Sequence, residues 1–255
     1  MCLIIFSWQP EARHPMTLVA NRDEFYDRPT KPAHFWPDNP EIFGGQDEKA
    51  GGSWLAINRS GRFAAVTNYR KWPAPEGQVS RGHLVKNSLS SSLPTHEFLQ
   101  TVQENSNLYT GFNFIAGDMN KLYYYSNIEN RIVTLKPGIY GLCNQFLNSP
   151  WPKLIKAKEA VTKALDTDNS ANPATLLDIM QNTEIAVDHL LPDTGIGKEK
   201  EVLLSSIFIR SPEYGTRNTS ILTFDNNNGI SWHEQTYGSN GRHQSLKQFS
   251  IELKA

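Results

Sequence analysis

Apolar residues occur mainly in short runs whose length is typical of strands. Residues 3–8 and 16–20 are rich in Leu, Ile, Val and Phe and are joined by a polar, proline-containing stretch, which predicts an antiparallel hairpin. A second hairpin is expected where residues 53–57 and 62–68 flank a turn at residues 58–61.

Further strands and three helices are expected along the rest of the chain. The strands cover residues 112–116, 122–126, 131–135, 202–209, 219–224 and 229–236. One helix begins at a cap at Thr95, and another is capped by Ser149 and runs to residue 165. A short third helix follows Asn172.

Residues 27–52 interrupt this pattern because they contain many Pro, Gly, Asp and Asn residues. This composition predicts an ordered loop or lid. A disordered linker is the weaker alternative, because Phe35, Trp36, Ile42 and Phe43 provide apolar anchors.

The grouping of the strands, with helices between and after them, predicts an α+β fold with antiparallel sheets. We expect one domain over residues 1–255, since folds of this length commonly form a single unit. The sequence contains neither GxGxxG nor GxxxxGKS/T, which disfavours nucleotide enzymes that cradle phosphates.

Charge and hydropathy limit the partners. With 25 Lys and Arg residues against 26 Asp and Glu residues, no global cationic field is present, so we expect no nucleic-acid partner. The longest apolar run, residues 1–6, is far shorter than a membrane span of roughly 20 residues and lacks the basic start of a signal peptide. We therefore expect a cytoplasmic protein without stable membrane insertion.

The two cysteines provide no disulfide framework, and the scattered histidines have no metal-ligand spacing. Cys2 is nevertheless the most informative residue. If Met1 is removed, Cys2 carries a thiol nucleophile and a free α-amine whose reference pKa is about 7.7–8. The alternative is that Cys2 is a buried strand residue, as we expect for Cys143.

Hairpin register predicts the neighbours of Cys2. If Trp8 lies opposite Met16, Cys2 lies opposite Arg22, with Cα atoms roughly 4.5–5.5 Å apart. A guanidinium at this position favours the thiolate. Asp23 is a candidate to orient the arginine or the amine, although neighbouring strand residues point to opposite faces.

Three more polar residues at expected strand ends or loops are candidate site residues. The amides of Asn68 and Asn144 are suited to donate to a developing oxyanion, which is the requirement of acyl transfer. The alternative for each is a turn or cap role. Arg217 is placed to bind a carboxylate, to support the site, or to serve the fold alone.

Many ordered blocks of this sequence resemble the Transport and Golgi organization 2 family, also called the NRDE family after Asn21-Arg22-Asp23-Glu24. The blocks cover residues 1–3, 21–24, 51–55, 67–70, 80–82, 111–113, 140–142, 144, 150–153 and 214–217. The family is similar to the N-terminal nucleophile (Ntn) hydrolases, which implies a four-layer αββα sandwich of antiparallel sheets.

In the cysteine branch of those enzymes the terminal Cys is the nucleophile, an Arg and an Asp support it, and asparagines hold the amine and the oxyanion. The resemblance implies these roles for Cys2, Arg22, Asp23, Asn68 and Asn144, with Arg217 as a further supporting residue. It implies no cofactor for catalysis.

The resemblance also implies an association with haem mobilisation, acyl metabolism and secretory organisation. Our main functional hypothesis is therefore the handling or trafficking of a small-molecule ligand, haem or an acyl compound. The alternative is a cysteine Ntn amidohydrolase that acts on a small amide or acyl-thioester. No spacing selects an axial haem ligand among Cys2 and the histidines.

Overall fold

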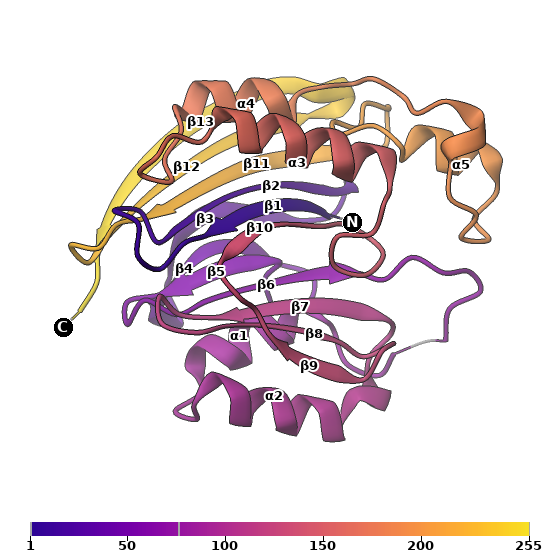
Figure 1. Ribbon diagram of the computed structural model, residues 1–255. Coiled ribbons are helices and arrows are strands. Elements are labelled where there is room, and N and C mark those ends of the chain that lie inside the picture. Colours follow the sequence, from indigo (N-terminus) through magenta and orange to yellow (C-terminus); the bar gives the residue numbers. More distant parts are fainter. Residues whose placement is uncertain (1, 76, 255) are drawn as a thin grey trace.

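The computed structural model describes residues 2–75 and 77–254, which form two antiparallel sheets packed face to face (Figure 1). Sheet A has the order β10-β1-β2-β11-β12-β13, and sheet B runs in numerical order from β3 to β9. Sheet A contains β1 (Cys2–Trp8), β2 (Met16–Phe25), β10 (Gly138–Leu142), β11 (Tyr214–Phe224), β12 (Gly229–Gly238) and β13 (Arg242–Glu252). Sheet B contains β3 (Thr30–Trp36), β4 (Asn39–Asp47), β5 (Leu55–Asn58), β6 (Phe63–Asn68), β7 (Phe112–Gly117), β8 (Leu122–Ser126) and β9 (Arg131–Thr134).

Helices cover the outer face of each sheet (Figure 1). The helices α1 (Gly82–Ser90) and α2 (Thr95–Glu104) pack on sheet B, whereas α3 (Pro152–Ala164) and α4 (Pro173–Met180) pack on sheet A. The short helix α5 (Lys198–Leu203) lies at the end of the sandwich where β1 begins. The expected α+β fold, a four-layer αββα sandwich, is confirmed.

Alternation along β1 distributes its side chains between two layers. Ile4 and Phe6 belong to the core between the sheets, whereas Leu3 and Ile5 pack with the α3 and α4 side chains. The strand is buried on both faces, which explains why its sequence is a nearly continuous apolar run.

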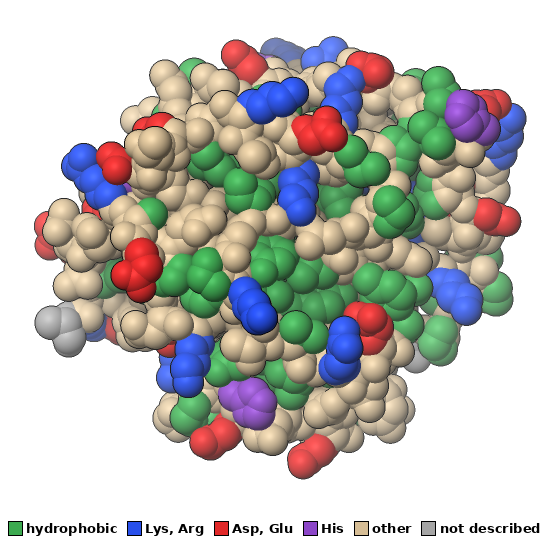
Figure 2. All heavy atoms as spheres, viewed as in Figure 1, with side chains coloured by type: hydrophobic (Ala, Val, Ile, Leu, Met, Phe, Trp, Pro, Cys, Tyr) green, Lys and Arg blue, Asp and Glu red, His purple; other side chains and the backbone are tan. Residues whose placement is uncertain are grey.

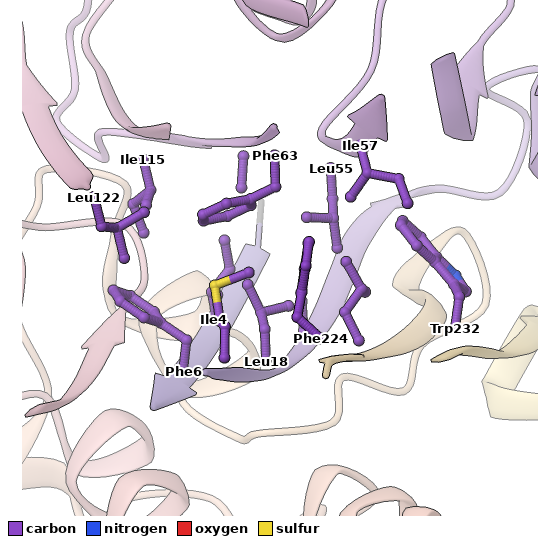
Figure 3. Close-up of a cluster of buried hydrophobic side chains, with 14 of the residues drawn as sticks. Ile4, Phe6, Leu18, Leu55, Ile57, Phe63, Ile115, Leu122, Phe224 and Trp232 are labelled. Atoms are coloured by element: carbon purple, nitrogen blue, oxygen red, sulfur yellow. The ribbon is translucent and has the colours of Figure 1, made fainter. Parts of the chain in front are cut away.

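The core between the sheets joins distant parts of the chain. Figure 3 shows Phe63, Leu55 and Ile57 of sheet B facing side chains of sheet A such as Leu18 and Phe224. The rings of Phe63 and Phe224 lie 6.5 Å apart across this layer. Burial of such large apolar side chains is the main stabilising contribution to a fold of this kind.

The surface agrees with the charge balance of the sequence. Charges of both signs are interspersed on the face shown in Figure 2, and hydrophobic side chains gather across its middle. Within residues 2–75 and 77–254, no helix is both long and apolar enough to cross a membrane.

The expected loop over residues 27–52 is wrong, because this segment forms β3 and β4. The residues taken as loop anchors are alternating strand residues: Phe43 enters the core between the sheets, and Trp36 and Ile42 pack under the helices of sheet B. Glycine inside β4 is required by packing, since a Cβ at Gly44 would lie 2.7 Å from the Ala56 Cβ.

Three further expectations need correction. Thr95 is the first residue of α2 and not its cap, since Pro94 holds that position and no side chain caps the helix. Residues 202–209 form no strand: α5 ends at Leu203, and the following apolar residues are buried in turns and irregular backbone. Ser149 does not cap α3, which begins at Pro152 after Trp151. Asn172 does cap α4, because its Oδ1 accepts a hydrogen bond from the Ala174 amide.

The sandwich predicts different costs for two leucine truncations in sheet A. Leu222→Ala truncates a β11 side chain that is 0 % exposed and lies between the sheets. Because the change leaves a cavity in the core, we expect the free energy of unfolding to fall by about 2–5 kcal/mol. The matched change Leu246→Ala in β13, where the side chain is 51 % exposed, should cost less than about 1 kcal/mol. Equilibrium chemical denaturation measures both, and equal losses would contradict the central position of β11.

Candidate active site at Cys2

The register of the first hairpin places Cys2 directly opposite Arg22, as the sequence predicts. The pairing runs without interruption from Trp8 and Met16 to this end of the strands. Cys2 is 7 % exposed and Arg22 is 4 % exposed, so the thiol and the guanidinium share a largely desolvated environment.

The Arg22 side chain is held by two contacts. Its guanidinium carbon lies 4.1 Å from the centre of the Trp54 ring, and Nη1 donates to Thr30 Oγ1 at 3.1 Å. A cation over an indole face is attracted by the ring quadrupole, more strongly where water is excluded. The ring itself lies against Gly45, where a Cβ would approach Trp54 Cη2 to 2.2 Å.

A pair of glycines also brings the segment before β5 close to the start of α1. A Cβ at Gly52 would lie 2.4 Å from the backbone carbon of Gly82, the first residue of α1. This close approach allows the Ser53 amide to donate to the Gly82 carbonyl at 3.1 Å. It places Trp54 and the residue before α1, Arg81, around one pocket.

The pocket has a volume of about 120 Å³, which is smaller than the roughly 300–1,000 Å³ typical of drug-sized ligands. Its walls are mainly polar and charged. They consist of Cys2, Arg22, Asp23, Glu24, Arg28, Asp47, Ser53, Trp54, Val66, Asn68, Ser80, Arg81 and Gly82.

Several effects act on the Cys2 thiol. Burial raises its pKa, the Asp23 and Glu24 carboxylates raise it further, and the Arg22 guanidinium lowers it. Arg22 therefore favours the thiolate as expected, but burial outweighs this effect in the described structure. Cys143, which is 0 % exposed, packs in the apolar layer under α3 and does not border the pocket.

The Asp23 carboxylate is directed differently from Arg22, as expected for neighbouring strand residues. Its Oδ1 accepts a hydrogen bond from Thr216 Oγ1 at 2.8 Å, and its carbonyl accepts one from the Tyr214 hydroxyl at 3.1 Å. Burial raises the pKa of Asp23, whereas Lys153, which is also buried, lowers it. Asp23 still borders the pocket of Cys2.

The two asparagines adjoin each other. Asn68 borders the pocket, and its backbone carbonyl accepts a hydrogen bond from Asn144 Nδ2 at 3.0 Å. Asn144 is 0 % exposed and is bound by Arg70, whose amide donates to the Asn144 carbonyl at 2.7 Å. Thus Asn68 is the asparagine beside Cys2, and Asn144 supports the end of β6.

Arg217 lies outside the lining of the Cys2 pocket. It is the extra residue of a β-bulge between Thr216 and Asn218, and its Nη1 donates to the carbonyls of Phe25 at 2.7 Å and Arg28 at 3.1 Å. It borders a separate cavity of about 80 Å³, which Trp54 also lines. Its contacts fix the end of β2.

Sequence reasoning assigned no role to several charged residues of this region. Arg28 pairs with Asp47 at 2.6 Å, and Arg81 lines the opposite wall. Arg70 forms a buried ion pair with Glu201 at 2.7 Å, which ties α5 to the end of β6. The available signal was their position, since Arg81 and Arg70 belong to the blocks that carry the family resemblance.

The fold is similar to that of a known hydrolase. A mutant of the conjugated bile acid hydrolase from Clostridium perfringens superposes with a TM-score of 0.54 at 10 % identity, covering 98 % of this chain and 92 % of that one. At this identity the likeness shows the fold alone, and it confirms the expected Ntn-hydrolase architecture.

Sequence comparison gives a narrower result. The Transport and Golgi organization protein 2 homolog of Homo sapiens is 35 % identical, over 92 % of this chain and 93 % of that protein. The Drosophila melanogaster Transport and Golgi organization protein 2 is 26 % identical, over 99 % and 98 %. The family model described as Transport and Golgi organisation 2 matches residues 1–239, and the chain belongs to this family.

Proposed function

We propose that the protein is a cysteine-dependent hydrolase of a small amide or acyl-thioester, with the Cys2 thiol as nucleophile. One observation supports this most: Cys2 borders a charged pocket directly opposite Arg22. The pocket also contains Asn68, whose amide is suited to stabilise an oxyanion. Cys143, by contrast, packs with apolar side chains under α3 and does not border this pocket.

The proposed reaction has two steps. Removal of Met1 exposes the Cys2 amine, which takes the thiol proton while the sulfur attacks the substrate carbonyl. Collapse of the tetrahedral intermediate releases the amine or thiol leaving group with that proton and leaves an acyl-cysteine thioester. Water, deprotonated by the same amine, then attacks the thioester, giving the carboxylic acid and regenerating the thiol.

Neighbouring residues would supply positioning and charge. Arg22 stabilises the thiolate, and Asn144 holds the Asn68 backbone through its side-chain amide. Asp23 is proposed to support the exposed amine, because it borders the same pocket and a carboxylate attracts an ammonium. Arg217 would act indirectly, by holding the Phe25 and Arg28 carbonyls at the end of β2.

A second candidate function, handling of an acyl ligand, is supported by another cavity. It has a volume of about 490 Å³ and is lined mainly by apolar residues. The lining includes Phe25, Leu203, Leu204 and Tyr214, with Lys200 exposed at the cavity. This size and composition suit an aliphatic chain whose carboxylate meets the lysine.

Haem fits neither cavity well. The Cys2 pocket, at about 120 Å³, is below the size range of organic ligand sites. The larger cavity is bordered by no His, Cys or Met side chain among the described residues, and its tyrosine, Tyr214, donates its hydroxyl to the Asp23 carbonyl. We therefore derive no step through haem and propose an acyl compound as the ligand.

We predict that Met1 is removed in the cell, because the Cys2 side chain that follows it is small. Met1 lies outside the described residues, so this remains a prediction from sequence. Intact mass spectrometry of protein from native cells measures it. Retention of Met1 in most molecules would exclude the terminal-amine mechanism and leave ligand handling as the function.

Thiol reactivity tests the pairing of Cys2 with Arg22. Iodoacetamide should label Cys2 before Cys143, and Arg22→Gln should slow the labelling of Cys2 at pH 8 about three- to tenfold by raising its thiol pKa. Labelling rates across pH, resolved by peptide mass spectrometry, give this pKa. The exposed Arg242→Gln serves as the matched control.

Removal of the Cys2 thiol decides between enzyme and carrier. We expect turnover in a panel of small amides and acyl-thioesters to be lost in Cys2→Ala, because the nucleophile is gone. Faster labelling of Cys143, or turnover that survives Cys2→Ala, would contradict the proposed site.

The second cavity predicts saturable binding of a fluorescent medium-chain fatty acid. Leu203→Glu should weaken this binding at least about tenfold, because it places a charge in an apolar wall and repels the carboxylate. The matched control Leu246→Glu alters an exposed residue of β13 and should leave binding unchanged. Hemin is titrated in parallel; saturable hemin binding without fatty-acid binding would make haem the ligand.

A further inference from the structure

Arg81 adds a positive charge to the Cys2 pocket besides Arg22 and Arg28, and Arg28 is already paired with Asp47. Arg81 directly precedes α1, is partly buried, and its Nη1 donates to the Gly111 carbonyl at 3.2 Å. Burial lowers its pKa, and Cys2, Glu24 and Arg28 all contribute to its electrostatic environment. Arginine nevertheless stays charged at physiological pH.

The carboxylates around the pocket are already engaged elsewhere. Asp47 Oδ2 lies 2.6 Å from Arg28 Nη2, and its Oδ1 accepts from the Lys49 and Ala50 amides at 3.0 and 3.3 Å. Glu24 accepts from the Phe25 amide at 2.9 Å and lies 3.8 Å from Arg28.

The third acid, Asp23, accepts from Thr216. In the part of the chain that the structure describes, no carboxylate lies within 4.0 Å of the guanidinium nitrogens of Arg22 or Arg81.

The two arginines are placed for different tasks. Arg22 pairs with Cys2 across the hairpin and is stacked on Trp54, so its charge acts on the thiol. Arg81 comes from another segment and leaves most of its five N–H donors without a protein acceptor among the described residues. A guanidinium with unused N–H donors binds a carboxylate, because the pair forms charge-assisted hydrogen bonds.

We propose that the Cys2 pocket is selective for a short acyl compound that carries a carboxylate, with Arg81 as the residue that binds this carboxylate. The proposal rests on the hydrolase function assigned to the same site. A volume of about 120 Å³ corresponds to roughly four water molecules, which suits a compact anionic group beside the reacting carbonyl. Arg81 is thus a specificity-determining residue for the reaction.

Two alkylating reagents of nearly equal size test this directly. Iodoacetate carries the carboxylate and iodoacetamide is its neutral counterpart, so the ratio of their rates at Cys2 measures the preference for an anion. We expect this ratio to fall roughly tenfold in Arg81→Gln, to change less than about twofold in Arg81→Lys, and to be unchanged in Arg242→Gln. Higher salt should lower the wild-type ratio by screening.

Protection experiments provide a second measurement. Succinate should protect wild-type Cys2 from iodoacetamide, whereas the uncharged succinamide should not, and Arg81→Gln should abolish the protection by succinate. The proposal would be overturned if, in the wild type, the ratio of the iodoacetate rate to the iodoacetamide rate did not depend on salt and succinate gave no protection. This outcome can be read even if Arg81→Gln fails to fold. If Cys2 prefers iodoacetate over iodoacetamide as expected but the protein turns over no substrate, only the hydrolase function is refuted.

Discussion

The pairing of β1 with β2 is the constraint on which the rest of the structure depends. These two interior strands of sheet A contribute Ile4 and Leu18 to the core between the sheets, and their pairing extends to Cys2 opposite Arg22. A slip of one residue would turn every inward side chain of β1 toward the helices. The same apolar alternation that stabilises the sandwich therefore also fixes the thiol beside the guanidinium.

The site combines rigid strand ends with a wall supplied by sheet B and α1. Arg22 reaches across to Trp54 of the segment before β5, so the two sheets are joined by a polar contact at the edge of an apolar core. Burial of the thiol opposes its ionisation, and the arginine only partly offsets this effect. A free amine at Cys2 is accordingly a chemical requirement of the proposed mechanism, since it supplies a base beside the thiol.

Sequence alone predicted the hairpins, a helix beginning near Thr95 and the Cys2–Arg22 register, because each depends on local periodicity and turn chemistry. It did not predict β3, β4 or β13, whose residues are glycine- and proline-rich or largely exposed and become strands by pairing with neighbours. The pocket roles of Arg28 and Arg81 depend on contacts between distant segments, which no local pattern encodes.

The contact between Gly45 and Trp54 has a consequence for how this pocket changes in evolution. The indole borders both the Cys2 pocket and the small cavity beside Glu234, and it lies where a side chain at position 45 would have to be. Any larger residue there must displace the ring, and Arg22 with it. A substitution of Gly45, which does not itself line the pocket, would therefore change the volume of the Cys2 pocket and the pKa of its thiol together. Evolution at this position cannot alter one of these properties without the other.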